Sequence, residues 1–174
     1  SLQAKTDLGA MAYRTAKGDD RPFVLLINYE AFWRQPVRQW ILTKTWDLAI
    51  ADECQELSTP GSNQSKCAAL LGHLSAKRLG LSGTPLRHGP LNAYGIYRFL
   101  DNRIFGTNYS SFRSKYAYCD PMFPSKVWRY LNVDDFNRRF GSIAFQFSGD
   151  PPCAELDVER TCVLGKESRR VYDE

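Results

Sequence analysis

Two adjacent carboxylates, Asp52 and Glu53, are the residues of this sequence best suited to chemistry, because they directly follow the apolar run at residues 48–51. Such a run is typical of a parallel strand that is buried on both faces of a sheet. In open α/β sheets, ligands bind just outside the carboxyl ends of the strands. There one acid can hold Mg²⁺ through water while the other orients or deprotonates an attacking water. The pair predicts phosphoryl chemistry, and a solvated pair of surface acids is the alternative.

A second segment with chemical potential, LGLSGTP at residues 79–85, also ends in small hydroxyl residues and glycine after an apolar stretch. The order and spacing of DECQ (residues 52–55) and SGTP (residues 82–85) resemble motifs II and III of superfamily-two helicases. The resemblance implies that Asp52 holds Mg²⁺ through water and that Glu53 acts on the attacking water. It also implies a set of residues that couple ATP to the rest of the motor: Gln55, Ser82, Gly83 and Thr84.

The elements that would position these residues follow from the apolar pattern. The run FVLLINY at residues 23–29 predicts a central parallel strand, and a helix is expected within residues 31–45, with Pro36 tolerated only in its first turn. A helix capped by Ser62 or Asn63 and a third strand at residues 76–81 follow. Apolar residues at helical spacing predict the buried stripe of that helix: Cys67, Leu70, Leu71 and Leu74. Three strand ends would then meet at one rim, which predicts an α/β fold with a RecA-like parallel sheet flanked by helices.

The region after SGTP narrows the resemblance to one branch of these helicases. Aromatic and small residues there match the pattern of the Swi/Snf-type DNA-dependent ATPases: Phe99, Leu100, Phe105, Gly106, Phe112 and Tyr116. Taken singly, these aromatics are expected to be core. The resemblance divides the chain into a partial RecA-like lobe at residues 1–90, a small helical protrusion at 91–150 and a return strand leading toward a second lobe at 151–174. Helices are expected at residues 91–100 and 133–140, and a strand at 142–146.

Nucleic-acid contacts are also implied by the resemblance. The family often carries T-Y-E at the end of the strand before the acid pair, and here Asn28 and Tyr29 stand in that motif. Together with Arg87 and His88, which follow SGTP, they are the expected contacts to the phosphate backbone. Binding to duplex DNA independent of sequence is therefore expected.

Composition places few limits on this reading. The chain has 174 residues, of which 43% are hydrophobic and 24% charged, as in ordinary globular domains. A net charge of +4 permits nucleic-acid binding without requiring it, and five scattered cysteines argue against a disulfide framework. No apolar run reaches the ~18–20 residues of a membrane helix, and no signal-peptide pattern begins the chain. We expect a cytoplasmic, nucleoid or nuclear protein that is neither secreted nor membrane-bound.

A phosphate-binding loop of the form G-x-x-x-x-G-K-[ST] does not occur in the sequence. The resemblance implies that this loop lies upstream of Ser1 and that a second RecA-like lobe follows Glu174. The chain then reads as a fragment of an ATP-dependent DNA translocase, with ATP and Mg²⁺ as cofactors of the intact protein and no activity of its own. The alternatives are a non-catalytic DNA- or protein-binding module derived from the same fold, and the motor part of a restriction enzyme.

Overall fold

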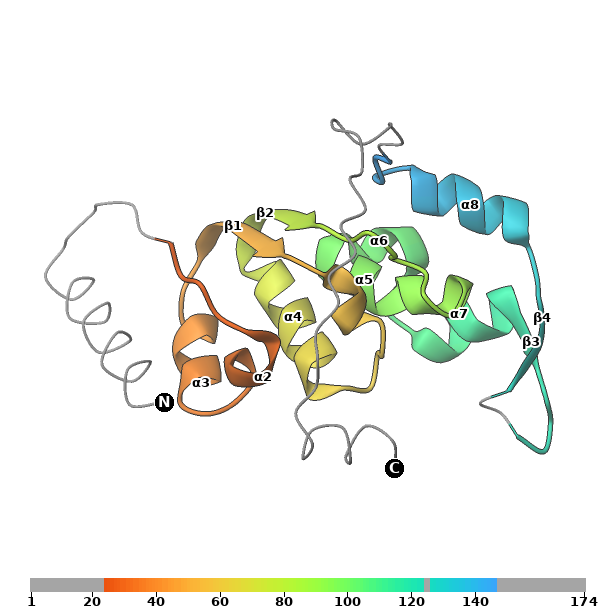
Figure 1. Cartoon of the computed structure of the whole chain (residues 1–174), viewed down its shortest axis with the longest axis horizontal. Helices are drawn as coiled ribbons and strands as arrows, with labels where there is room; N and C mark the ends of the chain where they lie inside the picture. Colours follow the sequence, from red (N-terminus) through yellow and green to blue (C-terminus); the bar gives the residue numbers. More distant parts are fainter. Residues whose placement is uncertain (1–23, 124–125, 147–174) are drawn as a thin grey trace, which may run out of the picture. The chain divides into compact units, whose positions relative to one another are not determined.

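The computed structural model describes residues 24–123 and 126–146 (Figure 1). The chain separates into two units, Ser1–Ala144 and Phe145–Glu174, and every described helix and strand lies in the first. The return strand expected within residues 151–174 lies outside the described residues. The expected division at residues 90 and 150 stays a prediction.

A two-stranded parallel sheet is the centre of the first unit. Strand β1 (Trp46–Ala51) pairs with β2 (Ser75–Gly80), and the register runs from Trp46 opposite Ser75 to Ala51 opposite Gly80. Helix α4 (Asn63–His73) connects them and begins at the predicted cap, because the hydroxyl of Ser62 accepts a hydrogen bond from the backbone of Ser65. This β–α–β unit fits the expected α/β fold, although the sheet is smaller than predicted.

The expectation that β1 is buried on both faces is wrong. Its side chains alternate: Ala49 and Ala51 are buried, whereas Leu48 and Ile50 are 48% and 57% exposed. The buried pair packs in one core with residues of α4, but no described element covers the opposite face. The helix stripe is confirmed only in part: Cys67 is buried, and Leu71 and Leu74 are half-buried, but Leu70 is exposed. Helix α4 buries three smaller residues in addition, Ser65, Ala68 and Gly72.

The strand predicted at residues 23–29 is also absent from its described part. Residues 24–28 form no ladder, and Val24 and Leu26 are 90% and 95% exposed. An apolar run becomes a strand only when a neighbouring strand satisfies its backbone groups, and no described strand pairs with this one. Helix α2 (Tyr29–Phe32) begins at its end instead, capped by the side chain of Asn28.

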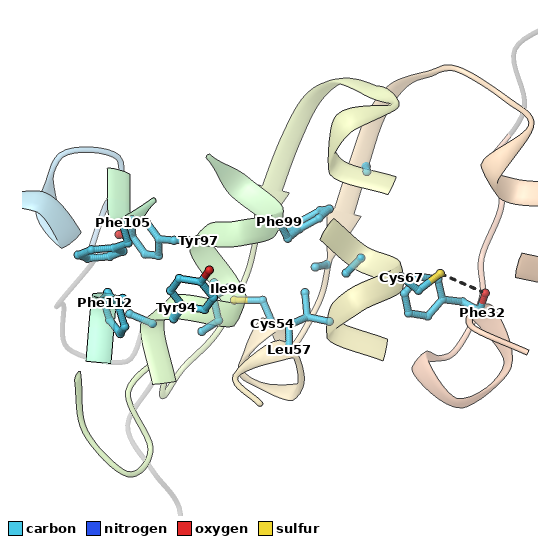
Figure 2. Packing of buried hydrophobic residues seen from close by; sticks show 14 of the residues in the cluster. Phe32, Cys54, Leu57, Cys67, Tyr94, Ile96, Tyr97, Phe99, Phe105 and Phe112 are labelled. Carbon is cyan, nitrogen blue, oxygen red and sulfur yellow. Dashed lines mark hydrogen bonds between the residues drawn. The ribbon is translucent and has the colours of Figure 1, made fainter. Parts of the chain in front are cut away.

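The helix expected within residues 31–45 is divided. After α2 the chain turns, and α3 (Val37–Leu42) begins with Pro36 at its N-cap, as the missing proline N–H favours. Both helices pack against α4. The thiol of Cys67 in α4 donates a 3.8 Å hydrogen bond to the carbonyl of Phe32 in α2 (Figure 2). The turn between α2 and α3 therefore lies against the first half of α4.

Helices and a hairpin make up the second half of the described chain. The 3-10 turn η2 (Pro90–Asn92) leads into α5 (Ala93–Leu100), followed by α6 (Asn102–Phe105) and α7 (Tyr109–Tyr116). Strands β3 (Ala117–Cys119) and β4 (Val127–Tyr130) form an antiparallel hairpin before α8 (Val133–Gly141). The strand expected at 142–146 is not found, because these residues continue from α8 as a turn and an irregular segment.

Aromatic packing holds these helices together. The ring of Phe105 lies 4.9 Å from that of Tyr97, 5.1 Å from Phe112 and 5.3 Å from Phe136, which joins α5, α6, α7 and α8 (Figure 2 shows the first three). The aromatics after SGTP are thus core residues, as expected. The carboxylate of Asp135 adds polar ties between α7 and α8, accepting hydrogen bonds from Lys115 and Tyr116 that hold its pKa well below its usual range.

No helix among the described residues is long and apolar enough to cross a membrane.

Candidate functional site

The acid pair lies in a tight turn at the carboxyl end of β1. Strand β1 ends at Ala51, and the 3-10 helix η1 (Cys54–Leu57) begins directly after Glu53. Glu53 has a left-handed backbone conformation with φ 49° and ψ 50°, which is uncommon for a residue with a side chain. The backbone N–H of Glu53 donates a 3.1 Å hydrogen bond to Oδ1 of Asp52, and both side chains are exposed. The turn therefore presents two carboxylates to solvent at the rim of the sheet.

Two backbone hydrogen bonds continue the strand pairing past the ends of the strands. The N–H of Leu81 donates to the carbonyl of Ala51 at 2.9 Å, and the N–H of Cys54 donates to the carbonyl of Leu81 at 2.8 Å. These two hydrogen bonds keep the segment after β1 next to the segment after β2. The two predicted motifs are therefore neighbours in space.

A chain of hydrogen bonds then joins the side chains of the two motifs. The amide of Gln55 donates to Oε2 of Glu53 at 2.6 Å, and the hydroxyl of Ser82 donates to Oε1 of Gln55 at 2.5 Å. The same hydroxyl accepts a 3.1 Å hydrogen bond from the backbone N–H of Thr84. Gln55 is buried, so its side chain is held in place between the two strand ends. We call these four residues the relay; Gly83, the remaining predicted coupling residue, lies exposed between its last two members.

Tyr29 of helix α2 also contacts the acid turn. Its hydroxyl donates a 2.7 Å hydrogen bond to the backbone carbonyl of Asp52. Burial raises the pKa of Tyr29 above its ordinary value, and the nearby Cys54 and Asp52 raise it further, so the hydroxyl stays a donor at neutral pH. Burial likewise raises the pKa of the Cys54 thiol to about 11, so that this residue is neutral beneath the turn.

Each of the four residues expected at the DNA has a partner within the described part of the chain. The side chain of Asn28 caps α2, and Tyr29 bonds to the acid turn. Arg87 forms a 4.0 Å ion pair with Glu56 of η1 while remaining half-exposed. The backbone N–H of His88 donates to Asn92, and its carbonyl accepts from Tyr130 of β4. Asn28, Tyr29 and Arg87 are thus tied to elements at or beside the acid turn, whereas His88 is tied to the hairpin.

The donor set at the acid turn suits a hydrated magnesium ion. Mg²⁺ prefers carboxylate oxygens and water and uses one or two protein carboxylates together with substrate phosphates. Within residues 24–123 and 126–146, no group of three or more His, Cys, Asp or Glu residues could enclose a metal. Asp52 uses only one carboxylate oxygen in the hydrogen bond to Glu53, which leaves the other for a metal-bound water.

Sequence reasoning missed three cations, Arg34, Arg38 and Lys66, which line one cavity of the structure. They lie on separate elements, and neither their spacing nor a motif marked them. Only the density of basic residues around residues 33–38 could have drawn attention to that segment.

The parallel β–α–β unit has an exposed acid pair at one strand end and a hydroxyl-rich loop at the next, which is where open α/β sheets bind their ligands. The model of the SNF2-related domain matches residues 10–129, and the chain belongs to that family. It is thus a member of the Snf2-type group of helicase superfamily two, whose members are ATPases and translocases. No curated protein and no solved structure matches the chain.

The relay makes a first prediction for the intact protein. Replacing Ser82 with alanine removes the hydrogen bonds to Gln55 and Thr84. Only the bond to Gln55 joins the two motifs, and one such bond is worth about 1 kcal/mol. We expect DNA stimulation of ATP hydrolysis to fall roughly fivefold, the rate equivalent of about 1 kcal/mol. Ser114→Ala is the control, because that exposed hydroxyl bonds only within its own helix. Equal stimulation in Ser82→Ala and the wild type would contradict a coupling role.

Proposed function

We propose that this chain is part of an ATP-dependent DNA translocase, in which ATP hydrolysis drives movement along duplex DNA. The observation that carries the proposal is the hydrogen-bonded connection from Glu53 through Gln55 to Ser82. It joins a carboxylate suited to activating water with a loop suited to sensing the result. Membership of the SNF2-related family supports the same interpretation, and so does the parallel β–α–β unit of β1, α4 and β2.

Within this proposal the two acids have different tasks. Asp52 would hold Mg²⁺ through water, and Mg²⁺ bound with ATP would supply charge neutralisation at the phosphates. Glu53 is the general base: Gln55 occupies its Oε2, which fixes the carboxylate and leaves Oε1 to accept a proton from water. Tyr29, which precedes the acid turn in the sequence, and Gln55, which follows it, hold the turn in place through hydrogen bonds. Ser82, Gly83 and Thr84 transmit the change from bound ATP to its hydrolysis products to a second lobe of the same protein.

The proposed partner is duplex DNA, contacted without reading its sequence. Asn28, Tyr29, Arg87 and His88 are the proposed contacts at the rim, where polar side chains and backbone amides reach phosphates. The experiment that tests the function is phosphate release by the complete protein, with and without duplex. Hydrolysis that rises on addition of unrelated duplexes supports a DNA-dependent motor. Hydrolysis indifferent to DNA overturns it and favours the non-catalytic module or another nucleotide hydrolase.

The 174-residue chain alone should not turn over ATP. Its sequence contains no phosphate-binding loop. The Swi/Snf-type ATPases that it resembles also carry an arginine finger, and this residue lies in their second lobe. An arginine finger alone is typically worth about 10³–10⁵ in rate. Phosphate release by residues 1–174 should therefore equal the buffer background, with the complete protein as the positive control. DNA-stimulated release by the chain that Glu53→Gln abolishes would show that the site is complete within these residues.

A further inference from the structure

A basic cavity of about 480 Å³ lies between the turn that joins α2 to α3 and the first half of α4. Three cationic side chains line it, Arg34, Arg38 and Lys66, together with the indole of Trp33 and the amides of Gln35 and Asn63. We call it the α2–α4 cavity. Because Cys67 of α4 bonds to the carbonyl of Phe32 next to it, the two walls are joined through the core (Figure 2).

The positive charges of this cavity are not balanced within the described residues. No carboxylate lines it, and none of its three cations forms a salt bridge with a described acid. Arg34 lies over the ring of Trp33 at 5.3 Å from its centroid. Arg38 faces Cys67, whose pKa is raised by burial, so the thiol is neutral and does not compensate the guanidinium.

Three described arginines elsewhere in the chain are held differently. Arg103 is paired with Asp101, and Arg138 and Arg139 with Asp135. In each of these pairs a described carboxylate balances the charge of the arginine. The three cations of the α2–α4 cavity converge from separate elements onto an open space, which is the arrangement expected of a site for an anion.

We propose that the α2–α4 cavity binds a backbone phosphate of duplex DNA, a contact additional to the four at the rim. Two guanidinium groups can donate paired hydrogen bonds to phosphate oxygens, and Lys66 adds a point charge. The amides supply neutral donors, and the indole offers an apolar wall to the sugar. The inference rests on the proposed translocase function, because that function supplies the duplex.

The position of the cavity suits a continuous path for the duplex. Helix α2 has four residues, with Tyr29 at one end bonded to the acid turn and Trp33 as its C-cap at the other. At about 1.5 Å per residue the rise between them is only about 6 Å. A duplex that reaches Asn28 and Tyr29 can therefore pass over the cavity. Cations on side chains of separate elements, without a glycine-rich nest of amides, also favour a passing backbone over an enclosed nucleotide.

The test is salt-dependent binding of a fluorescent duplex by the whole chain. In the triple variant Arg34→Gln, Arg38→Gln, Lys66→Gln we expect the slope of log affinity against log salt to fall by at least about 0.9, the contribution of one neutralised phosphate. The loss should be equal for duplexes of unrelated sequence. Lys66→Gln alone should lower the slope as well. Because Lys66 is exposed, this variant should fold normally, so that a lower slope cannot be attributed to misfolding. Lys77→Gln, another exposed lysine but on β2, is the matched control and should leave the slope unchanged.

Further arms separate this inference from the proposed function. If Arg87→Gln lowers the slope and the triple variant does not, the cavity is not on the DNA path, while the rim contacts stand. No binding of duplex by the wild type at low salt overturns the inference, and ATP hydrolysis by the complete protein then judges the function separately. Quenching of tryptophan emission by duplex, lost in Trp33→Phe, would support occupation of the cavity. The same quenching by inorganic pyrophosphate, with duplex binding unchanged in the triple variant, would assign it to small anions and overturn the proposal.

Discussion

Glu53→Gln in the complete protein is expected to bind ATP normally and to hydrolyse it at least about 10²-fold more slowly, the scale of a lost general base. Glutamine keeps the length of the side chain and an oxygen that can still accept the hydrogen bond from Gln55. The left-handed backbone conformation at residue 53 is equally strained with glutamate and with glutamine, so the change should not alter the turn. What the change removes is the carboxylate charge. Phosphate release and equilibrium binding of a fluorescent ATP analogue measure the two quantities separately.

Glu56→Gln is the matched control for this prediction. Glu56 lies three residues further on in η1, is exposed, and loses only its ion pair with Arg87, which at such exposure contributes little. Its hydrolysis rate should stay close to that of the wild type. Normal hydrolysis in Glu53→Gln would identify the Asp52–Glu53 pair as a surface feature and remove the central assignment. Equal loss in both variants would point to a general effect of charge at the rim.

The order of the site along the sequence could be predicted because local signals coincide there. An apolar run, an acid pair and a hydroxyl-rich loop mark the two strand ends, and β1 and β2 lie where the pattern indicates. The relay was predicted only as a set of residues, since its bonds depend on how the strands pair. A shift of register by one residue would turn Gln55 away from Ser82.

The predictions that took an apolar run as a sign of complete burial were wrong, both for β1 and for residues 23–29 as far as they are described. Ile50 is as apolar as a central strand requires, yet it is exposed because no described layer covers its face. Residues 24–27 are apolar but form no strand, since burial and strand pairing depend on neighbouring elements and not on the apolar run itself. The three cations of the α2–α4 cavity escaped prediction for the same reason, because their meeting is a property of tertiary packing.

Gly95→Ala is expected to destabilise the folded chain by about 1–3 kcal/mol, the usual cost of overpacking. In the interior of a helix, alanine is normally better than glycine by about 1 kcal/mol. Here the sign reverses because α5 is pressed against η1: a Cβ on Gly95 would collide with the backbone carbonyl of Leu57 and come within 3.0 Å of the hydroxyl of Ser65. Backbone cannot move aside as a flexible side chain would. Urea denaturation of residues 1–174, followed by circular dichroism, measures the change.

Gly141→Ala provides the comparison that isolates this contact. Gly141 ends helix α8, and nothing lies within 4 Å of a Cβ built on it, so this variant should be neutral or more stable by up to about 1 kcal/mol. Because η1 carries Gln55, the collision at Gly95 should also displace the relay. The complete protein with Gly95→Ala should then lose DNA stimulation as Ser82→Ala does, even under conditions where it remains folded. Equal urea midpoints for the two glycine variants would show that α5 can withdraw from η1 without cost, and that the relay does not depend on their contact.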